Sequence, residues 1–358
     1  MSEQSVSEYL AKEGQRITNE IKQYLKDKSS DEYIWGLLGK SPYVYDHQAI
    51  NKSILEPAWY LLSQGGKRLR AVLTMLLLDS LGANSEDYKE FAIIPEIIHN
   101  ATLILDDIED GSKMRRNAPC VHIKFGLDIA VNLANFLLYF PIVALMSSNK
   151  LDNSKKDKLL SIYVKEMLRI GTGQAIDIAW HNSLVDIESI TEEEYLQTAF
   201  DKTGVLTRFS AELAGILAGV DEATFKALGD FGAAIGVVFQ IKDDMLNISS
   251  SKLAESKGGI GEDITEGKVT LALIYALKLA TPEDKRKLLS IIKSHTTNME
   301  EISEAIAIMQ KYNVENKLKA TMSEIMNAAW LSLKPILKDS PSKDKLSLLV
   351  DFIMERNY

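Results

Sequence analysis

Apolar residues recur at three- and four-residue spacing along almost the whole chain, as at Ile54, Ala58 and Leu61, and again at Ile302, Ile306 and Met309. This spacing places them on one face of a helix. No segment shows the sustained alternation with period two that a half-buried strand needs. We therefore predict an all-α fold, a single large helical bundle with about ten or more helices.

The breaks between these helical stretches are short. They fall at turn-forming residues, for example at residues 40–42, 249–261 and 339–341, and none is long enough or rich enough in Pro, Gly and Ser to be an interdomain linker. We predict one helical domain over residues 45–358, preceded by a charged helical N-terminal extension over residues 1–44. Residues 5–27 are amphipathic, and could cover the bundle, mediate assembly or contact a membrane.

Composition narrows the class of protein. A net charge of -9 and a pI near 5.3 argue against nucleic acid as the main partner, because binding to the phosphate backbone needs a concentrated basic surface. The only cysteine, Cys120, allows neither an internal disulfide nor a cysteine-built metal site, and the start of the chain has no signal-peptide pattern. We expect a cytoplasmic protein. The longest apolar run, residues 136–146, is shorter than the roughly 18 residues that span a bilayer, so we predict no transmembrane segment.

An apolar helix that turns acidic is predicted at residues 97–110, with the sequence IIHNATLILDDIED. Asp106 and Asp110 share one face, and Asp107 and Glu109 flank them. Two carboxylates at 4 Å repel by about 4 kcal/mol at an effective dielectric of 20, so the group needs a cation, and oxygen ligands alone suit magnesium. A solvated acidic helix end is the alternative. Against it, the preceding residues are too apolar for an exposed face, and cations that can bind phosphate follow at once: Lys113, Arg115 and Arg116.

A second acidic helix has the sequence FQIKDDMLN, in which Asn247 stands where the first motif has Asp110. Its acids are Asp243 and Asp244. Basic segments accompany the two acidic helices: GGKRLR at residues 65–70, Lys202 and Thr203 before Gly204, and Lys257 and Lys268 on either side of GGIGEDITEG. A glycine pair before a basic helix start lets the backbone approach an anion. Each lysine alone is more typical of a surface, and it is the combination that indicates a site.

Six motifs occur in order between about residues 49 and 280, namely GGKRLR, HNATLILDDIEDGSKMRR, GTGQAIDIAW, FDKTG, FQIKDDMLN and GEDITEGK. On these motifs the sequence resembles the trans-isoprenyl diphosphate synthases, and in detail their geranylgeranyl diphosphate synthase branch. The resemblance implies the isoprenoid synthase type of helical bundle with a central cavity. It also implies a homodimer that condenses isopentenyl diphosphate with dimethylallyl, geranyl or farnesyl diphosphate. Geranylgeranyl diphosphate is the expected product.

The resemblance also assigns roles to residues. Asp106 and Asp110 would bind two magnesium ions supported by Asp107, and Asp243 would bind a third, with Asp244 and Gln240 beside it. Isopentenyl diphosphate would be held by Lys67, Arg70, His99 and Arg116. The allylic diphosphate would be held by Arg115, Lys202, Thr203, Gln240, Lys257 and Lys268, although the spacing from Lys257 to Lys268 is one residue longer than in that branch. Gln174 and Asp177 would line the cavity.

Product length in such enzymes depends on residues one helical turn before the first acidic motif. Here they are Ala101 and Thr102, whose small side chains would leave the channel open and predict a product of at least twenty carbons. Its floor would be formed deeper in the bundle, although aromatic residues at helical spacing are by default plain core. The candidate floor residues are Ile98, Phe136, Leu137 and Tyr139.

Two alternatives have the same helical signature. A class I terpene cyclase shares the aspartates and the metal, but it has no need for the second diphosphate site that Lys67, Arg70 and His99 imply. A non-catalytic regulatory subunit would be expected to lose metal ligands, and this chain departs only at Asn247.

Overall fold

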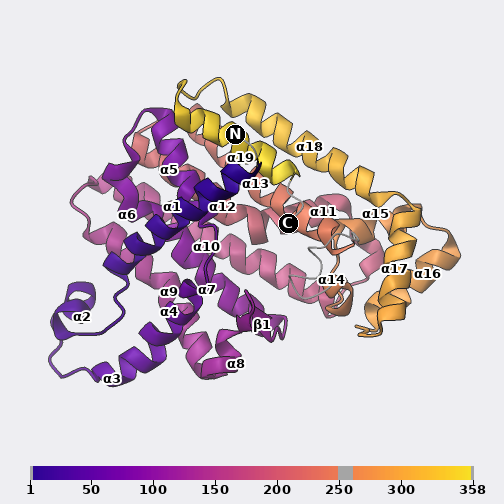
Figure 1. Ribbon diagram of the computed structural model, residues 1–358, viewed down its shortest axis with the longest axis horizontal. Coiled ribbons are helices and arrows are strands. Elements are labelled where there is room, and N and C mark those ends of the chain that lie inside the picture. The colour runs from indigo at the N-terminus through magenta and orange to yellow at the C-terminus, as the bar shows by residue number, and fades with distance from the viewer. Residues whose placement is uncertain (1–2, 249–260, 356–358) are drawn as a thin grey trace. The chain divides into compact units, whose positions relative to one another are not determined.

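A computed structural model describes residues 3–248 and 261–355 (Figure 1). In this part of the chain there are nineteen α-helices, four short 3-10 or π segments and one hairpin of two-residue strands. The predicted all-α class is confirmed. The chain forms two compact units: an N-terminal unit of residues 1–161 and 213–219, and a C-terminal unit of residues 162–212 and 220–358.

The N-terminal unit contains the first Asp-rich helix. Its elements are α1 (Glu3–Tyr24), α2 (Asp31–Leu38), α3 (His47–Ile50), the π-helical η1 (Asn51–Leu55), α4 (Glu56–Ser63), α5 (Leu69–Leu81), the 3-10 segment η2 (Ser85–Tyr88), α6 (Lys89–Ala92), α7 (Ile94–Glu109), β1 (Met114–Arg115), β2 (Ala118–Pro119), α8 (Val121–Phe125) and α9 (Leu127–Ser147).

The core of this unit lies between α7 and α9, which pack along one another. Ile97, Ala101 and Ile104 of α7 meet apolar residues of α9 such as Leu133 and Leu137. The first helix enters the same core with its buried Ile17 and Ile21, and the buried Leu25 directly follows its end. Helix α1 is therefore part of this core.

The C-terminal unit contains the second Asp-rich helix. Its elements are α10 (Asn153–His181), the 3-10 segment η3 (Ile187–Ser189), α11 (Glu192–Ala199), the π-helical η4 (Phe200–Gly204), α12 (Val205–Ala218), α13 (Glu222–Asn247), α14 (Glu262–Thr265), α15 (Leu271–Leu279), α16 (Pro282–Lys293), α17 (Met299–Lys311), α18 (Val314–Leu333) and α19 (Pro341–Glu355). The first part of α10 and the end of α12 belong to the N-terminal unit.

Helix α13 is the centre of the C-terminal unit. Asp221 caps its start by accepting a hydrogen bond from the Thr224 backbone, and long α18 packs along it. A β-carbon on Gly236 would lie 2.5 Å from the α-carbon of Gly204, so these two glycines let α13 and η4 pack backbone to backbone. Farther along, α16 and α17 form an adjacent helical pair (Figure 1).

Two helices in the described ranges, α9 and α13, are long and apolar enough to meet the length and composition of a membrane span. Of their most apolar windows, 41% and 61% are buried within the structure. Core helices pass the same test, so this is weak evidence for a span, and α13 carries Lys242, Asp243 and Asp244 in its last turns.

Candidate functional site

The first Asp-rich motif ends α7, and the hairpin β1–β2 folds back beside it. Arg116 and Asn117 occupy the two-residue turn, both with positive φ, as a type I′ hairpin requires. This turn brings Arg115 to the aspartates: its Nη2 lies 2.6 Å from Asp107 Oδ1 and 3.7 Å from Asp106 Oδ2. Its Nε donates to the same Asp107 oxygen at 2.7 Å.

The adjacent aspartates of this motif differ in burial. The side chain of Asp107 is 2% exposed, whereas that of Asp106 is 26% exposed. Burial alone would lower the pKa of Arg115, but the hydrogen bond and charge of Asp107 outweigh it and raise that pKa. Asp107 therefore fixes a permanently charged Arg115, and Asp106 and Asp110 are left half-buried at the end of the helix.

Several arginines surround His99, which lies on α7 almost two turns before Asp106. Burial and the charges of four arginines hold the pKa of His99 well below its usual value. We call these residues the arginine cluster: Arg68, Arg70, Arg115 and Arg116. A neutral imidazole among four guanidinium groups can donate a hydrogen bond to an anion.

The 65–68 loop bends close to this cluster. Arg116 Nη1 donates to the Gly65 carbonyl at 2.5 Å, and a β-carbon on Gly66 would lie 3.3 Å from its guanidinium. Arg70 Nε is buried without a hydrogen-bond partner among the described residues. An orphaned buried donor beside crowded cations is the arrangement expected of an anion site.

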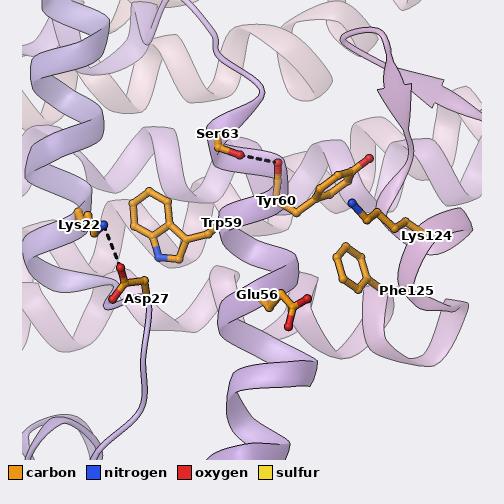
Figure 2. Close-up of a pocket in the computed structure, with 8 residues that line it drawn as sticks. All are labelled: Lys22, Asp27, Glu56, Trp59, Tyr60, Ser63, Lys124 and Phe125. Carbon is orange, nitrogen blue, oxygen red and sulfur yellow. Dashed lines mark hydrogen bonds and ion pairs between the residues drawn. The ribbon is translucent and has the colours of Figure 1, made fainter.

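An open surface pocket of about 360 Å³ is lined by aromatic residues of α4 and α8, near the hairpin (Figure 2). None of the predicted site residues lines it. The Tyr60 hydroxyl donates to the Pro119 carbonyl of β2 at 2.8 Å, and its ring meets Phe125 edge to face. Lys124 Nζ lies 3.7 Å from the centre of the Tyr60 ring. The hydrogen bond from Tyr60 to Pro119 therefore supports the hairpin that carries Arg115.

In the C-terminal unit, α10 and η4 bring Lys202 to Asp177. Lys202 Nζ lies 2.5 Å from Asp177 Oδ2. A β-carbon on Gly173 would lie 2.7 Å from the Lys202 nitrogen, so only glycine in the GTGQ segment lets α10 pack this closely on η4. Lys202 and Thr203 occupy a π-helical segment, a distortion that is frequent at functional sites.

A chain of hydrogen bonds then links Thr203 to the second Asp-rich motif. Thr203 Oγ1 donates to Gln240 Oε1 at 2.8 Å, and Gln240 Nε2 donates to Asp244 Oδ1 at 2.9 Å. The other oxygen of Asp244 accepts from the Tyr195 hydroxyl at 2.5 Å and from the Leu271 backbone at 3.2 Å. Asp244 is buried, and its desolvation raises its pKa to about 6 despite these donors. Asp243 is half-buried.

Two further predicted residues lie near the end of α13. Lys268 pairs with Glu266 at 2.5 Å. Asn247 Oδ1 accepts from the Asp263 backbone at 3.4 Å, so its amide connects α13 to α14. Lys257 lies outside the described residues.

The residues predicted to set product length divide between core and surface. Ile98 and Ala101 are fully buried, Thr102 is half-buried, and its hydroxyl donates to the His99 carbonyl at 2.9 Å. Phe136 packs on the core and stacks on Phe140, with ring centres 5.5 Å apart. Leu137 is buried, but Tyr139 is 69% exposed and does not line the interior of its unit.

Comparisons with known proteins show the family of this chain. The polyprenyl synthetase family model matches residues 51–309. The chain belongs to the polyprenyl synthetase family. It is 30% identical to the short chain isoprenyl diphosphate synthase of Methanothermobacter thermautotrophicus over 86% of this chain and 91% of that protein. It is 36% identical to the Methanocaldococcus jannaschii protein of the same description, over 84% and 88%. The crystal structure of geranylgeranyl pyrophosphate synthetase from Pyrococcus horikoshii covers 99% of both chains, with a TM-score of 0.84 and 26% identity.

Members of the polyprenyl synthetase family use magnesium, and the donors present here fit that ion only in part. In residues 3–248 and 261–355, no three His, Cys, Asp or Glu side chains are grouped to hold a metal by themselves. Magnesium usually takes one or two carboxylates and completes its shell with water and substrate phosphate oxygens. Asp106 and Asp110, and separately Asp243, supply that number of hard oxygens, so binding would depend on a bound diphosphate.

Several residues around these sites carry no signal in the sequence. Tyr195 and Glu96 are examples: Glu96 Oε1 accepts from the Arg70 backbone at 2.9 Å. Behind η4, Arg169 Nη1 donates to Asp201 Oδ1 at 3.3 Å, next to Lys202 in the chain. Their partners lie 26 to 49 residues away, and only a fold can bring them together.

Proposed function

We propose that this chain is a magnesium-dependent prenyltransferase that condenses isopentenyl diphosphate with an allylic diphosphate to give geranylgeranyl diphosphate. One observation carries the proposal. Each Asp-rich helix pairs a half-buried aspartate with a buried aspartate that accepts a hydrogen bond from a residue proposed to bind diphosphate: Arg115 in the N-terminal unit and Gln240 in the C-terminal unit.

The chain's own residues would act first on the allylic diphosphate. Arg115, Lys202 and Thr203 would bind its oxygens, and Asp106, Asp110 and Asp243 would hold magnesium against them, with three ions expected. Bound magnesium would supply charge stabilisation for the diphosphate as its carbon–oxygen bond breaks. Lys202 would exchange its pairing with Asp177 for the phosphate oxygens as substrate binds.

The arginine cluster distinguishes condensation from cyclisation. A cyclase ionises one allylic diphosphate and needs no second anion site. Here a neutral His99 and the orphaned Nε of Arg70 lie on α7 and α5. With Lys67 and Arg116 they would hold isopentenyl diphosphate. Its double bond would attack the allylic cation, and the proton lost would go to the released diphosphate.

The expected product has twenty carbons. Ala101 is buried one helical turn before Asp106, and only small side chains occupy this place and the next. The test is incubation with magnesium, labelled isopentenyl diphosphate and five-, ten- or fifteen-carbon primers, followed by sizing of the dephosphorylated alcohols. We expect a dominant twenty-carbon alcohol, shortened to fifteen carbons by Ala101→Phe. Products of thirty carbons or more would contradict the proposed floor at Ile98 and Phe136.

We also propose a homodimer, working in the cytoplasm, as the functional form. Large apolar side chains are exposed at intervals of four to eight residues along α8 and α9: Ile123, Leu127, Val131, Tyr139 and Met146. Such a stripe on a helix with mean hydropathy 2.0 is typical of an interface. Light scattering of Leu127→Glu should report half the mass of the wild-type particle, and an unchanged mass would exclude this face.

A further inference from the structure

Helix α1 contacts the 65–68 loop at two adjacent turns. A β-carbon on Gly14 would lie 3.1 Å from the Gly66 carbonyl oxygen and 3.6 Å from Arg68 Cγ. One turn later, Thr18 Oγ1 accepts a hydrogen bond from Arg68 Nε at 3.3 Å and donates to the Gly14 carbonyl at 2.8 Å. The buried Ile17 and Ile21 hold this face of α1 against the core.

The loop needs such support because its backbone is unusual. Gly65 and Gly66 have φ of 90° and 132°, and Arg68, which is not a glycine, has φ of 47°. Left-handed conformations at non-glycine residues persist only where the surroundings fix them. Arg68 is 3% exposed, and its Nη2 donates to the Leu62 carbonyl at 2.6 Å. The side chain of Arg68 is therefore buried and supports the loop, and it is not a surface cation.

Arg68 is also connected to the residues of the anion site through Glu96. Arg68 Nη1 lies 4.0 Å from Glu96 Oε2, and the other oxygen of the same carboxylate accepts a hydrogen bond from the Arg70 backbone. On the loop's other side, the Gly65 carbonyl receives Arg116 Nη1. A shift of the loop by a few tenths of an ångström would therefore change where Lys67, Arg70 and Arg116 meet an anion.

We propose that Gly14 and Thr18 of α1 are positioning residues that set the affinity for isopentenyl diphosphate by holding the 65–68 loop. This inference rests on the proposed function for the identity of the anion. It makes the first helix a part of that binding site.

The experiment compares Gly14→Leu and Thr18→Val with Ala11→Leu, which places the same leucine side chain at an exposed position of α1, and with Thr18→Ser, which keeps the hydroxyl. Calorimetric titration gives the Kd for isopentenyl diphosphate without turnover, and steady-state kinetics gives KM for each substrate. We expect Gly14→Leu and Thr18→Val to weaken isopentenyl diphosphate binding by about tenfold. KM for farnesyl diphosphate should change by less than about twofold, and both controls should match wild type.

The outcomes separate the two proposals. Unchanged Kd for isopentenyl diphosphate in the folded Thr18→Val variant would overturn the positioning role, and so would an equal rise in both KM values. If Gly14→Leu does not fold, Thr18→Val and its Thr18→Ser rescue decide the matter. Wild-type protein that binds isopentenyl diphosphate but forms no product would overturn the proposed function and leave the positioning role to the Kd values. Wild-type protein that binds none would overturn both.

Discussion

The two Asp-rich helices use the same pair of residues with different partners. In α7 the buried Asp107 is paired with a charged arginine, and in α13 the buried Asp244 accepts hydrogen bonds from three neutral groups of the described residues. The carboxylate before each is half-buried. The two acids of a DD pair are thus not equivalent: on the proposed function, the half-buried acid would meet the metal, and the buried acid would position the residues that bind phosphate. We expect the charge of the residue paired with the buried aspartate to decide whether removing that aspartate affects substrate binding or the stability of the fold.

The half-buried acids should show the largest effects. Asp106→Asn should lower kcat/KM by roughly 10³-fold, because charge stabilisation by the metal contributes several kcal/mol to the barrier. Glu109→Gln, an exposed position on the same turn, serves as the control and should stay within twofold. Steady-state rates over a range of magnesium concentrations test this. Activity above a tenth of wild type in Asp106→Asn would remove Asp106 from the metal site.

Buried acids without a dominant cation should make stability depend on pH. Burial raises the pKa of Glu166 to about 7, opposed by Arg208 and Arg169 and reinforced by Glu212 and Asp201. The folded state therefore holds this proton more tightly than the unfolded chain. The contribution of Glu166 to the free energy of unfolding is greatest below about pH 4.5 and falls as pH rises toward 7.

Glu166→Gln should remove that component, which is on the order of 3 kcal/mol. Urea unfolding at pH 5 and pH 8 measures it as the difference between wild type and variant, so that the similar contribution of Asp244 cancels. The same pH dependence in both proteins would show that Glu166 stays ionised.

Asp244→Asn should mainly affect stability. Its amide nitrogen would face a donor, either Gln240 Nε2 or the Leu271 backbone, and a buried unpaired donor costs about 2 kcal/mol. Tyr195→Phe removes one of the three donors and should cost about half as much. Unfolding free energies from urea titrations give both values. An Asp244→Asn variant as stable as wild type would mean that the hydrogen-bonded chain from Thr203 is not intact.

Asp107→Asn should mainly affect binding. Asparagine can still accept from Arg115, but the charge that fixes its guanidinium is lost, so KM for the allylic diphosphate should rise about tenfold. The rise should shrink at high salt, since the loss is electrostatic. A fall in stability with no change in KM would reverse the contrast between the two buried aspartates.

The smallest change is expected at the position where the two motifs differ in sequence. Asn247→Asp gives the second motif an acid at the place that Asp110 has in the first. The side chain of Asn247, however, already accepts a hydrogen bond from the Asp263 backbone. We expect less than about a twofold change in kcat, since a carboxylate can accept the same bond. A marked fall in the magnesium concentration needed for half activity would show that position 247 can reach the metal.

The sequence predicts these helices well because their chemistry is local. DDIED and FQIKDD each put a carboxylate on a helix end, and periodicity gives the helix around it. The sequence could not show which aspartate of each DD pair is buried. The buried residues are Asp107 and Asp244, and their partners Arg115 and Tyr195 are placed by a hairpin turn and by α11. Periodicity also fails in α9, which is apolar on nearly every face, so Tyr139 was expected inside and lies on the surface.

The most direct test of the account is the ratio of isopentenyl diphosphate incorporated to diphosphate released, measured on the same sample with farnesyl diphosphate as primer. The account predicts one molecule incorporated for each diphosphate released, and no release when isopentenyl diphosphate is omitted. Release from farnesyl diphosphate alone, with a hydrocarbon as product, would contradict it, because the arginine cluster around His99 would then have no second substrate to bind.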